Sequence, residues 1–294
     1  MNDLRSILKE LGIKPKSYEK QNKTTIIDSD KGKYVIKRNT NNTDIYNYLN
    51  TRSFYKIPKY YNLKNNNYDI SLYINDTNVP EIQKIEDLII ILSELHYKTS
   101  YYRENDLDEI KENYETIKEN LFNLLKYYND LNDYLDRQIF LSPSEYLLIR
   151  NISLIYFMIN YTLNSIEGWY QQISENKRFR VSLIHNNISI DHLLINENKY
   201  LISWDKSKVE RPIFDLLSLY KKYYRNLKLG DLFNIYNQHN CLDNEEKMLL
   251  MIYLQIPKKI IFTNNHLEDV IDINNEILYL KKIYEYIKNN NNIK

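Results

Sequence analysis

Residues 181–217 decide the fold, and they read VSLIHNNISIDHLLINENKYLISWDKSKVERPIFDLL. Residues 181–184 are typical of a buried strand, and residues 193–195 and 200–204 predict two more short strands. Polar residues fill the loops between them, and a helical pattern begins after Pro212. This order of elements can place several polar side chains at the mouth of a cleft.

Several residues of the stretch keep the spacing of a longer pattern. The pattern is H-G-D-x-x-x-x-N-x-L, then I-D-W/F-[DE], then P-x-x-D-L. The matching residues are His185, Leu194, Trp204, Asp205, Pro212, Asp215 and Leu216. On these residues the stretch resembles the active-site region of the aminoglycoside phosphotransferase and choline-kinase-like superfamily. The resemblance implies an α+β, bilobal, protein-kinase-like fold, with a small β-rich N-lobe and a large, mainly helical C-lobe.

The resemblance also assigns roles to three positions where the residue differs from the pattern. In that family an Asp acts as base toward the acceptor hydroxyl, an Asn five residues later holds magnesium, and the Asp of I-D-W binds the metal that bridges the phosphates. Here Asn187, His192 and Ser203 stand at those positions, and Asn186 replaces the glycine of H-G-D. The motifs are therefore degenerate, with a framework that is kept and no chemical residue intact.

Each replacement weakens one step of phosphoryl transfer. The amide of Asn187 cannot take up a proton near pH 7, so general-base help of about 10²–10⁴-fold is lost. Magnesium prefers charged oxygen ligands, whereas Ser203 offers a neutral hydroxyl and His192 an imidazole. We therefore expect no tightly held cofactor and only weakened binding of ATP and magnesium.

Outside this stretch the resemblance is weaker but spans nearly the whole chain. Lys37 resembles the strand lysine that binds nucleotide phosphates, and Asp44 is the nearest acid that could be its partner. A strand-end lysine more often snorkels or pairs with an acid. Residues 93–96 resemble the L-H element of the first large helix. Residues 254–258, Leu-Gln-Ile-Pro-Lys, resemble the P-x-K step of the bacterial spore-coat kinase-like (CotS-type) branch.

Hydrophobic periodicity predicts the remaining elements. Strands are expected at 17–21, 24–28, 33–37, 60–63 and 68–74, with a turn at 30–32. Helices are expected at 4–11, 44–51, 82–97, 107–137 and 144–176, and from 212 to a frayed tail at 289–292. The polar segment 75–80 is the predicted linker. It divides an N-lobe at 1–78 from a C-lobe at 79–294 that carries the degenerate loop.

Composition excludes several classes of protein. The chain has 294 residues, 43% of them hydrophobic, so it can bury a sizeable core. Its net charge of +1 gives no global case for a nucleic-acid partner. The most apolar long stretch, 146–163, is interrupted by polar residues, so no membrane span is expected. The lone Cys241 excludes an internal disulfide framework and suits a cytoplasmic location.

Glycine is scarce, with four residues where average usage of about 7% would give roughly twenty. Glycine supplies the backbone shapes from which phosphate-binding loops are built. The segment 19–23, between the first two predicted strands, has none. This scarcity argues against tight phosphate binding but not against the fold.

Three functions remain open at this point. The first is a pseudokinase without phosphotransfer, which binds or scaffolds an unknown protein partner or small molecule and is not an enzyme. The second is a small-molecule O-phosphotransferase whose metal and nucleotide site is rebuilt with Asp191 or Asp205. The third, from the CotS-type resemblance alone, is a spore-coat-associated assembly protein.

Structural roles compete with these assignments. Asp205 could be a solvated or loop-bracing acid, and Asp215 resembles the family's buried acid that braces the loop. His185 and His192 lack a third ligand, so they form no standard zinc pattern. Trp169 and Trp204 suit the core better than a stacking role against a ligand ring.

Overall fold

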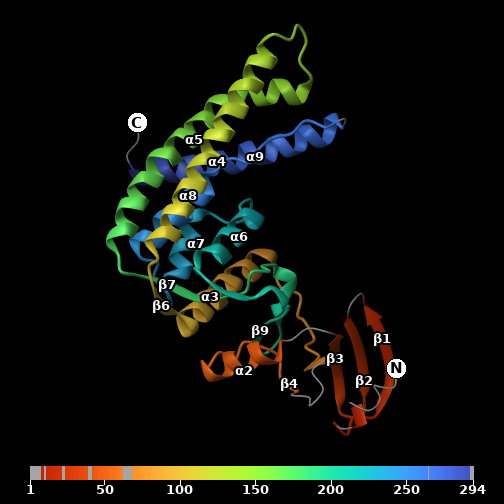
Figure 1. The fold of residues 1–294 in the computed structure, drawn as a ribbon. Coiled ribbons are helices and arrows are strands. Elements are labelled where there is room, and N and C mark those ends of the chain that lie inside the picture. The colour runs from red at the N-terminus through yellow and green to blue at the C-terminus, as the bar shows by residue number, and fades with distance from the viewer. Residues whose placement is uncertain are drawn as a thin grey trace. The chain divides into compact units, whose positions relative to one another are not determined.

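The computed structural model describes residues 8–9, 11–21, 24–38, 42–61, 68–263 and 265–291 (Figure 1). The chain forms two compact units. The first combines Met1–Ser100 with Ser182–Glu210, and the second combines Tyr101–Val181 with Arg211–Lys294. Most of the stretch that decides the fold therefore belongs to the same unit as the N-terminal strands. The lobe boundary near residue 78 stays a prediction.

A five-stranded antiparallel sheet forms the N-terminal part of the first unit. Its strands are β1 (Pro15–Gln21), β2 (Thr24–Ser29), β3 (Gly32–Arg38), β4 (Tyr60–Tyr61) and β5 (Tyr68–Leu72), in the order β1-β2-β3-β5-β4. Gly32 has a φ of 114°, which suits the tight turn between β2 and β3. Ile27, Ile36 and Ile70 pack in its core. The predicted β-rich N-terminal region is confirmed. Residues 62–63 and most of the helix predicted at 4–11 lie outside the described residues.

Helices and several short strands also belong to the first unit. α2 (Thr43–Thr51) follows β3. The stripe predicted for α3 (Glu81–Thr99) is buried and consists of Ile85, Leu88, Ile89, Leu92 and Leu95. β8 (Leu193–Ile195) pairs with β9 (Lys199–Leu201), and β10 (Lys208–Glu210) pairs with the end of β7 (Arg178–Ile184). The strand predicted at 200–204 is shorter than expected, because Trp204 begins the 3₁₀ turn η2 (Trp204–Lys206).

The polar segment 75–80, predicted as a linker, is hydrogen-bonded to β8. Asp76 Oδ1 accepts from the backbone N–H of Ile195 at 2.7 Å, and the N–H of Thr77 donates to Ile195 O at 2.6 Å. Lys84 Nζ binds Asp76 Oδ2 at 2.7 Å. The segment is thereby joined to a strand from a distant part of the sequence within the same unit.

The second unit is mainly helical, as predicted (Figure 1). Its helices are α4 (Leu107–Asp136), α5 (Pro143–Glu175), α6 (Ile213–Tyr223), α7 (Leu229–Tyr236), α8 (Asn244–Gln255) and α9 (His266–Asn291). Ser142 and Asp243 form capping boxes that start α5 and α8. β6 (Tyr101–Glu104), which was not predicted, pairs with the first half of β7. The frayed tail predicted at 289–292 is wrong as far as Asn291, because α9 continues to that residue.

Within the described ranges, no helix combines the length and the apolar character that a membrane crossing requires.

Two arginine–glutamate pairs are buried at the start of α8. Arg180 Nε and Nη2 donate to the two carboxylate oxygens of Glu246 at 2.8 and 2.5 Å, and Nη1 donates to Asn240 Oδ1 at 2.7 Å. Arg211 Nη1 donates to both oxygens of Glu245, at 2.7 and 2.9 Å. The side chain of Glu246 is fully buried and that of Arg180 is 13% exposed. Buried charges of this kind are tolerated only because they are paired.

Candidate functional site

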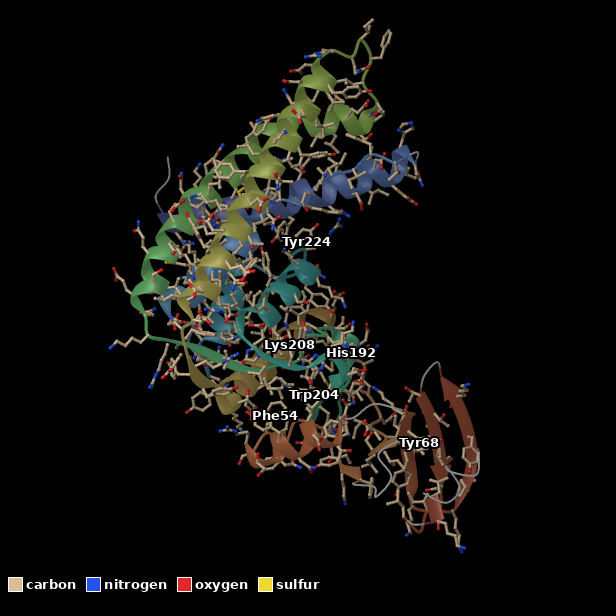
Figure 2. All side chains as sticks on the ribbon, in the orientation of Figure 1. Phe54, Tyr68, His192, Trp204, Lys208 and Tyr224 are labelled. Atoms are coloured by element: carbon tan, nitrogen blue, oxygen red, sulfur yellow. The ribbon has the colours of Figure 1, made fainter. Side chains whose placement is uncertain are left out.

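The segment after β7 carries the framework residues of the first unit, and Figure 2 shows one of them, Trp204, near Phe54. His185 follows the strand and is fully buried, and its Nε2 donates to Ile202 O at 2.8 Å. Its ring packs edge-on against Trp204, with ring centres 4.9 Å apart. Trp204 also contacts Phe54, with ring centres 6.1 Å apart. These contacts hold the polar loop against the residues that precede η2.

Two residues of this region adopt the left-handed backbone conformation. Asn186 has a φ of 54° and Ser203 a φ of 68°. Asn186 stands at the glycine position of the pattern, and asparagine tolerates this conformation because its short polar side chain can hydrogen-bond locally. Its Nδ2 donates to Lys206 O at 3.0 Å. Asn186 thus adopts the left-handed conformation that a glycine would adopt at this position of the pattern.

Asn187 is hydrogen-bonded to both of the other substituted positions. Asn187 Nδ2 donates to Ser203 O at 3.4 Å, and His192 Nδ1 donates to Asn187 O at 2.7 Å. A carbonyl oxygen only accepts, so Nδ1 of His192 carries a hydrogen. The side chain of His192 therefore binds the backbone of its own loop, and that of Asn187 binds the backbone of the segment that precedes η2.

Asn42 joins two carboxylates next to these loops. Its Nδ2 donates to Asp205 Oδ1 at 3.1 Å, and its backbone N–H donates to Asp69 Oδ2 at 3.3 Å. Asn42 itself is buried. Burial raises the pKa of the neighbouring Tyr46, and the negative charges of Asp69 and Asp205 raise that pKa further. The surroundings of Asn42 are therefore electronegative.

Lys37 and Asp44 lie on neighbouring elements of the first unit. Lys37 is half-buried on β3, where its backbone pairs with Asp69 of β5. Asp44 is exposed in the first turn of α2, and among the described residues no ion pair joins it to Lys37. The acid across the strand from Lys37 is Asp69. The nucleotide-binding roles of Lys37 and Asp44 stay predictions.

Asp191 and Asp205, the candidates for a rebuilt metal site, are both exposed. Asp191 Oδ2 accepts from Ser189 Oγ at 2.9 Å. In the part of the chain that the structure describes, no three His, Cys, Asp or Glu side chains gather as a metal site requires. The three substituted positions offer an amide, an imidazole and a hydroxyl, whereas magnesium prefers charged oxygen ligands. The residues present do not fit the family's metal.

Two further predicted residues belong to the second unit. Asp215 is fully buried in the first turn of α6. Its role in bracing the loop stays a prediction. Trp169 is buried on α5 and donates from Nε1 to Glu245 Oε1 at 2.7 Å. Trp169 and Trp204 are thus both core residues, as expected.

Sequence reasoning missed Asn42, Tyr46 and Asp69. Asp69 carried a usable signal, because an acid inside a predicted strand needs a polar partner when it is shielded from water. Asn42 carried none, because it lies in a run of similar asparagine and threonine residues.

Comparison with known proteins supports the fold. No family profile and no curated protein matches the sequence. An aminoglycoside phosphotransferase from Alicyclobacillus acidocaldarius has a similar structure, with a TM-score of 0.68 and 11% identity, over 97% of this chain and 96% of that one. The AMP-bound spectinomycin phosphotransferase APH(9)-Ia gives a TM-score of 0.54 and 14% identity, over 96% of this chain and 98% of that one.

These likenesses cover nearly the full length of each chain, and their low identity restricts them to the fold. The predicted fold class is confirmed: the chain is an α+β protein with a β-rich N-terminal region and a mainly helical C-terminal part. Its architecture is that of the aminoglycoside phosphotransferases.

Proposed function

We propose that this chain, which has the fold of aminoglycoside phosphotransferases, is a pseudokinase that binds or scaffolds a partner and does not transfer phosphoryl groups. One observation carries the proposal. The positions that the resemblance assigns to the base and to the two metal ligands hold Asn187, His192 and Ser203, and Asn187 is hydrogen-bonded to each of the other two.

Asn187, at the position of the base, can bind a ligand hydroxyl but cannot help to phosphorylate it. Asn187 donates through Nδ2 to Ser203 O, which fixes the orientation of its amide. An amide oxygen can accept a hydrogen bond from a ligand hydroxyl but cannot remove its proton near pH 7. A hydroxyl-bearing ligand at this position would be held and would stay unphosphorylated.

The charges around Asn42 also disfavour nucleotide phosphates. Asp69 and Asp205 both accept hydrogen bonds from Asn42, and Asp69 lies opposite Lys37 in the sheet. A phosphate chain without its magnesium would be repelled by two carboxylates at short range. The carboxylate of Asp69 also offsets the attraction that Lys37 would exert on phosphate.

One feature favours a second candidate, a small-molecule O-phosphotransferase with a rebuilt site. Asp205 is exposed, lies two residues after Ser203, and is held in place by Asn42. In this candidate Asp205, or Asp191, would replace the missing metal ligand. A spore-coat assembly role would be a special case of scaffolding and rests on the CotS-type resemblance alone.

Isothermal titration with ATP, with and without magnesium, tests the proposal on the full chain. We expect no magnesium-dependent binding and no ATP consumption in the presence of small-molecule alcohols. The variant Asn187→Asp/His192→Asn/Ser203→Asp restores the residues of the pattern and should gain magnesium-dependent binding. Asn186→Asp is the matched control, because it adds a negative charge to the same loop outside the three positions.

Tight magnesium-dependent ATP binding with turnover by the wild-type chain would contradict the pseudokinase proposal. Asp205→Asn and Asp191→Asn would then locate the rebuilt site, since removing the replacement ligand should abolish that turnover. Turnover that survives both changes would reject the second candidate as well.

A further inference from the structure

We infer that the end of the α4–α5 hairpin docks into an apolar pocket of a partner protein, and that lysine and arginine residues surround this pocket. We call this end the hairpin tip and define it by Tyr134, Ile139, Phe140 and Tyr146. The inference goes beyond the proposed function, because the tip lies in the second unit and its docking needs no nucleotide.

Exposure singles out the hairpin tip. Ile139 and Phe140 are each 89% exposed, and Tyr134 and Tyr146 are each 58% exposed. Single exposed apolar side chains are ordinary on protein surfaces, but here four lie within 13 residues around the turn that joins α4 to α5. The apolar residue Leu135 beside them is 2% exposed and already packs inside the unit. The tip residues therefore take no part in the hydrophobic core of the unit.

Hydrogen bonds hold the backbone of the tip in a defined shape. The N–H of Ser142 donates to Glu145 Oε2 at 2.6 Å, and the N–H of Glu145 donates to Ser142 Oγ at 3.3 Å. On the other side, the N–H of Gln138 donates to Leu135 O at 3.0 Å. Docking a segment that is already ordered costs less conformational entropy than docking a flexible one.

The shape of the tip indicates a concave partner site. Figure 1 shows the loop at the end of two long helices, away from β6 and β7 of the same unit. A projecting end with two adjacent large apolar side chains, Ile139 and Phe140, fits a pocket better than a flat surface. Apolar anchors that fill such pockets usually dominate the binding energy of an interface.

The charges around the tip indicate the chemistry of the pocket's rim. Residues 130–146 contain four acids and one base, which gives a local net charge of −3 in a chain of net charge +1. The acids are Asp130, Asp133, Asp136 and Glu145, and the base is Arg137. Like charge disfavours an anionic membrane and the tip of a second copy. Complementary potential favours a pocket rimmed by lysine and arginine.

Photo-crosslinking from the tip tests this inference. The full chain with a benzophenone amino acid in place of Phe140 is irradiated in an extract of the source cells, and the crosslinked peptides are sequenced. We expect one main partner, crosslinked through an apolar segment flanked by lysine or arginine. Unlabelled wild-type chain should compete with the crosslink. The competitor Ile139→Ser/Phe140→Ser should be weaker by about tenfold or more.

Matched variants separate docking from folding. Phe122→Ser removes a 51% exposed aromatic residue from α4 away from the tip, and this variant should compete like the wild-type chain. The tip variant should melt at the wild-type temperature, because Ile139 and Phe140 are exposed. Asp133→Asn/Asp136→Asn and added salt should both weaken the crosslink.

Several results would overturn the inference. These are a crosslink only to another copy of the chain, a partner site without basic residues, and equal competition by the tip variant. Absence of any specific crosslink would also overturn it, as would tip-dependent flotation with phosphatidylserine vesicles. An active phosphotransferase would refute the proposed function and leave this inference standing.

Discussion

Changing Glu246 to glutamine should destabilise the second unit by about 3–5 kcal/mol, because the change leaves the buried charge of Arg180 without a carboxylate to compensate it. The side chain of Glu246 is fully buried, and both of its oxygens bind Arg180. Burial by itself lowers the pKa of Arg180, but the hydrogen bonds and the charge of Glu246 raise it overall. The guanidinium of arginine is so basic that it stays protonated even without Glu246, so in the Glu246→Gln variant Arg180 remains charged and its burial is no longer compensated by a carboxylate.

Tryptophan fluorescence can follow the second unit alone. The chain has two tryptophans, Trp169 in the second unit and Trp204 in the first. In a Trp204→Phe background, urea unfolding monitored at Trp169 reports the free energy of unfolding of the second unit. Glu246→Gln should lower that free energy by the stated amount.

Two further variants show whether the buried charge is the cause. The pair Arg178–Glu104 is exposed and 4.0 Å apart, so Glu104→Gln should change the free energy of unfolding by less than about 1 kcal/mol. Arg180→Met/Glu246→Leu removes both buried charges and should recover most of the loss. A cost below about 1 kcal/mol for Glu246→Gln, or an equal cost for Glu104→Gln, would refute the reasoning.

Three other changes test separate features. Ser203→Gly should stabilise the first unit by about 1 kcal/mol, because glycine relieves the left-handed strain at some cost in chain entropy. Unfolding followed at Trp204 measures this, and a loss of stability would refute it. Asn42→Asp should destabilise the chain by about 1–3 kcal/mol at pH 7, because it adds a third carboxylate to the two that Asn42 joins. The loss should shrink at pH 4, and a pH-independent loss would contradict the explanation. Lys118 and then Tyr114 lower the pKa of Glu167, so the stability contributed by Glu167 is complete above its ordinary pKa and is lost as the pH falls through the lowered value. Glu167→Gln should therefore lower the urea midpoint at pH 7 and leave it unchanged in strong acid, and an equal effect at both pH values would contradict this sign.

The long helices could be predicted because their apolar period repeats over many residues. The stripe of α3 and the helix that begins at Pro143 behind Ser142 are local signals, and the structure confirms both. β6 and β10 could not be predicted, because each is short and depends on pairing with β7. Propensity alone gives little information for such strands.

In the candidate site, too, local patterns could be predicted from the sequence and long-range contacts could not. Spacing along one stretch identified Asn187, His192 and Ser203, and the structure brings these residues together. The contact between Asn42 and Asp205 joins residues 163 positions apart, so no local pattern indicates it. Long-range polar contacts of this kind follow from the fold and cannot be derived from neighbouring residues.

The bonds between the segment 75–80 and β8 have a consequence for slow motion. Bending of the chain at Asp76 and Thr77 requires the two hydrogen bonds to Ile195 to break together. In hydrogen exchange, the amides of Thr77 and Ile195 should therefore give the same free energy of opening, as one cooperative event. The segment with the composition of a linker would then be among the slower-exchanging loops of the first unit.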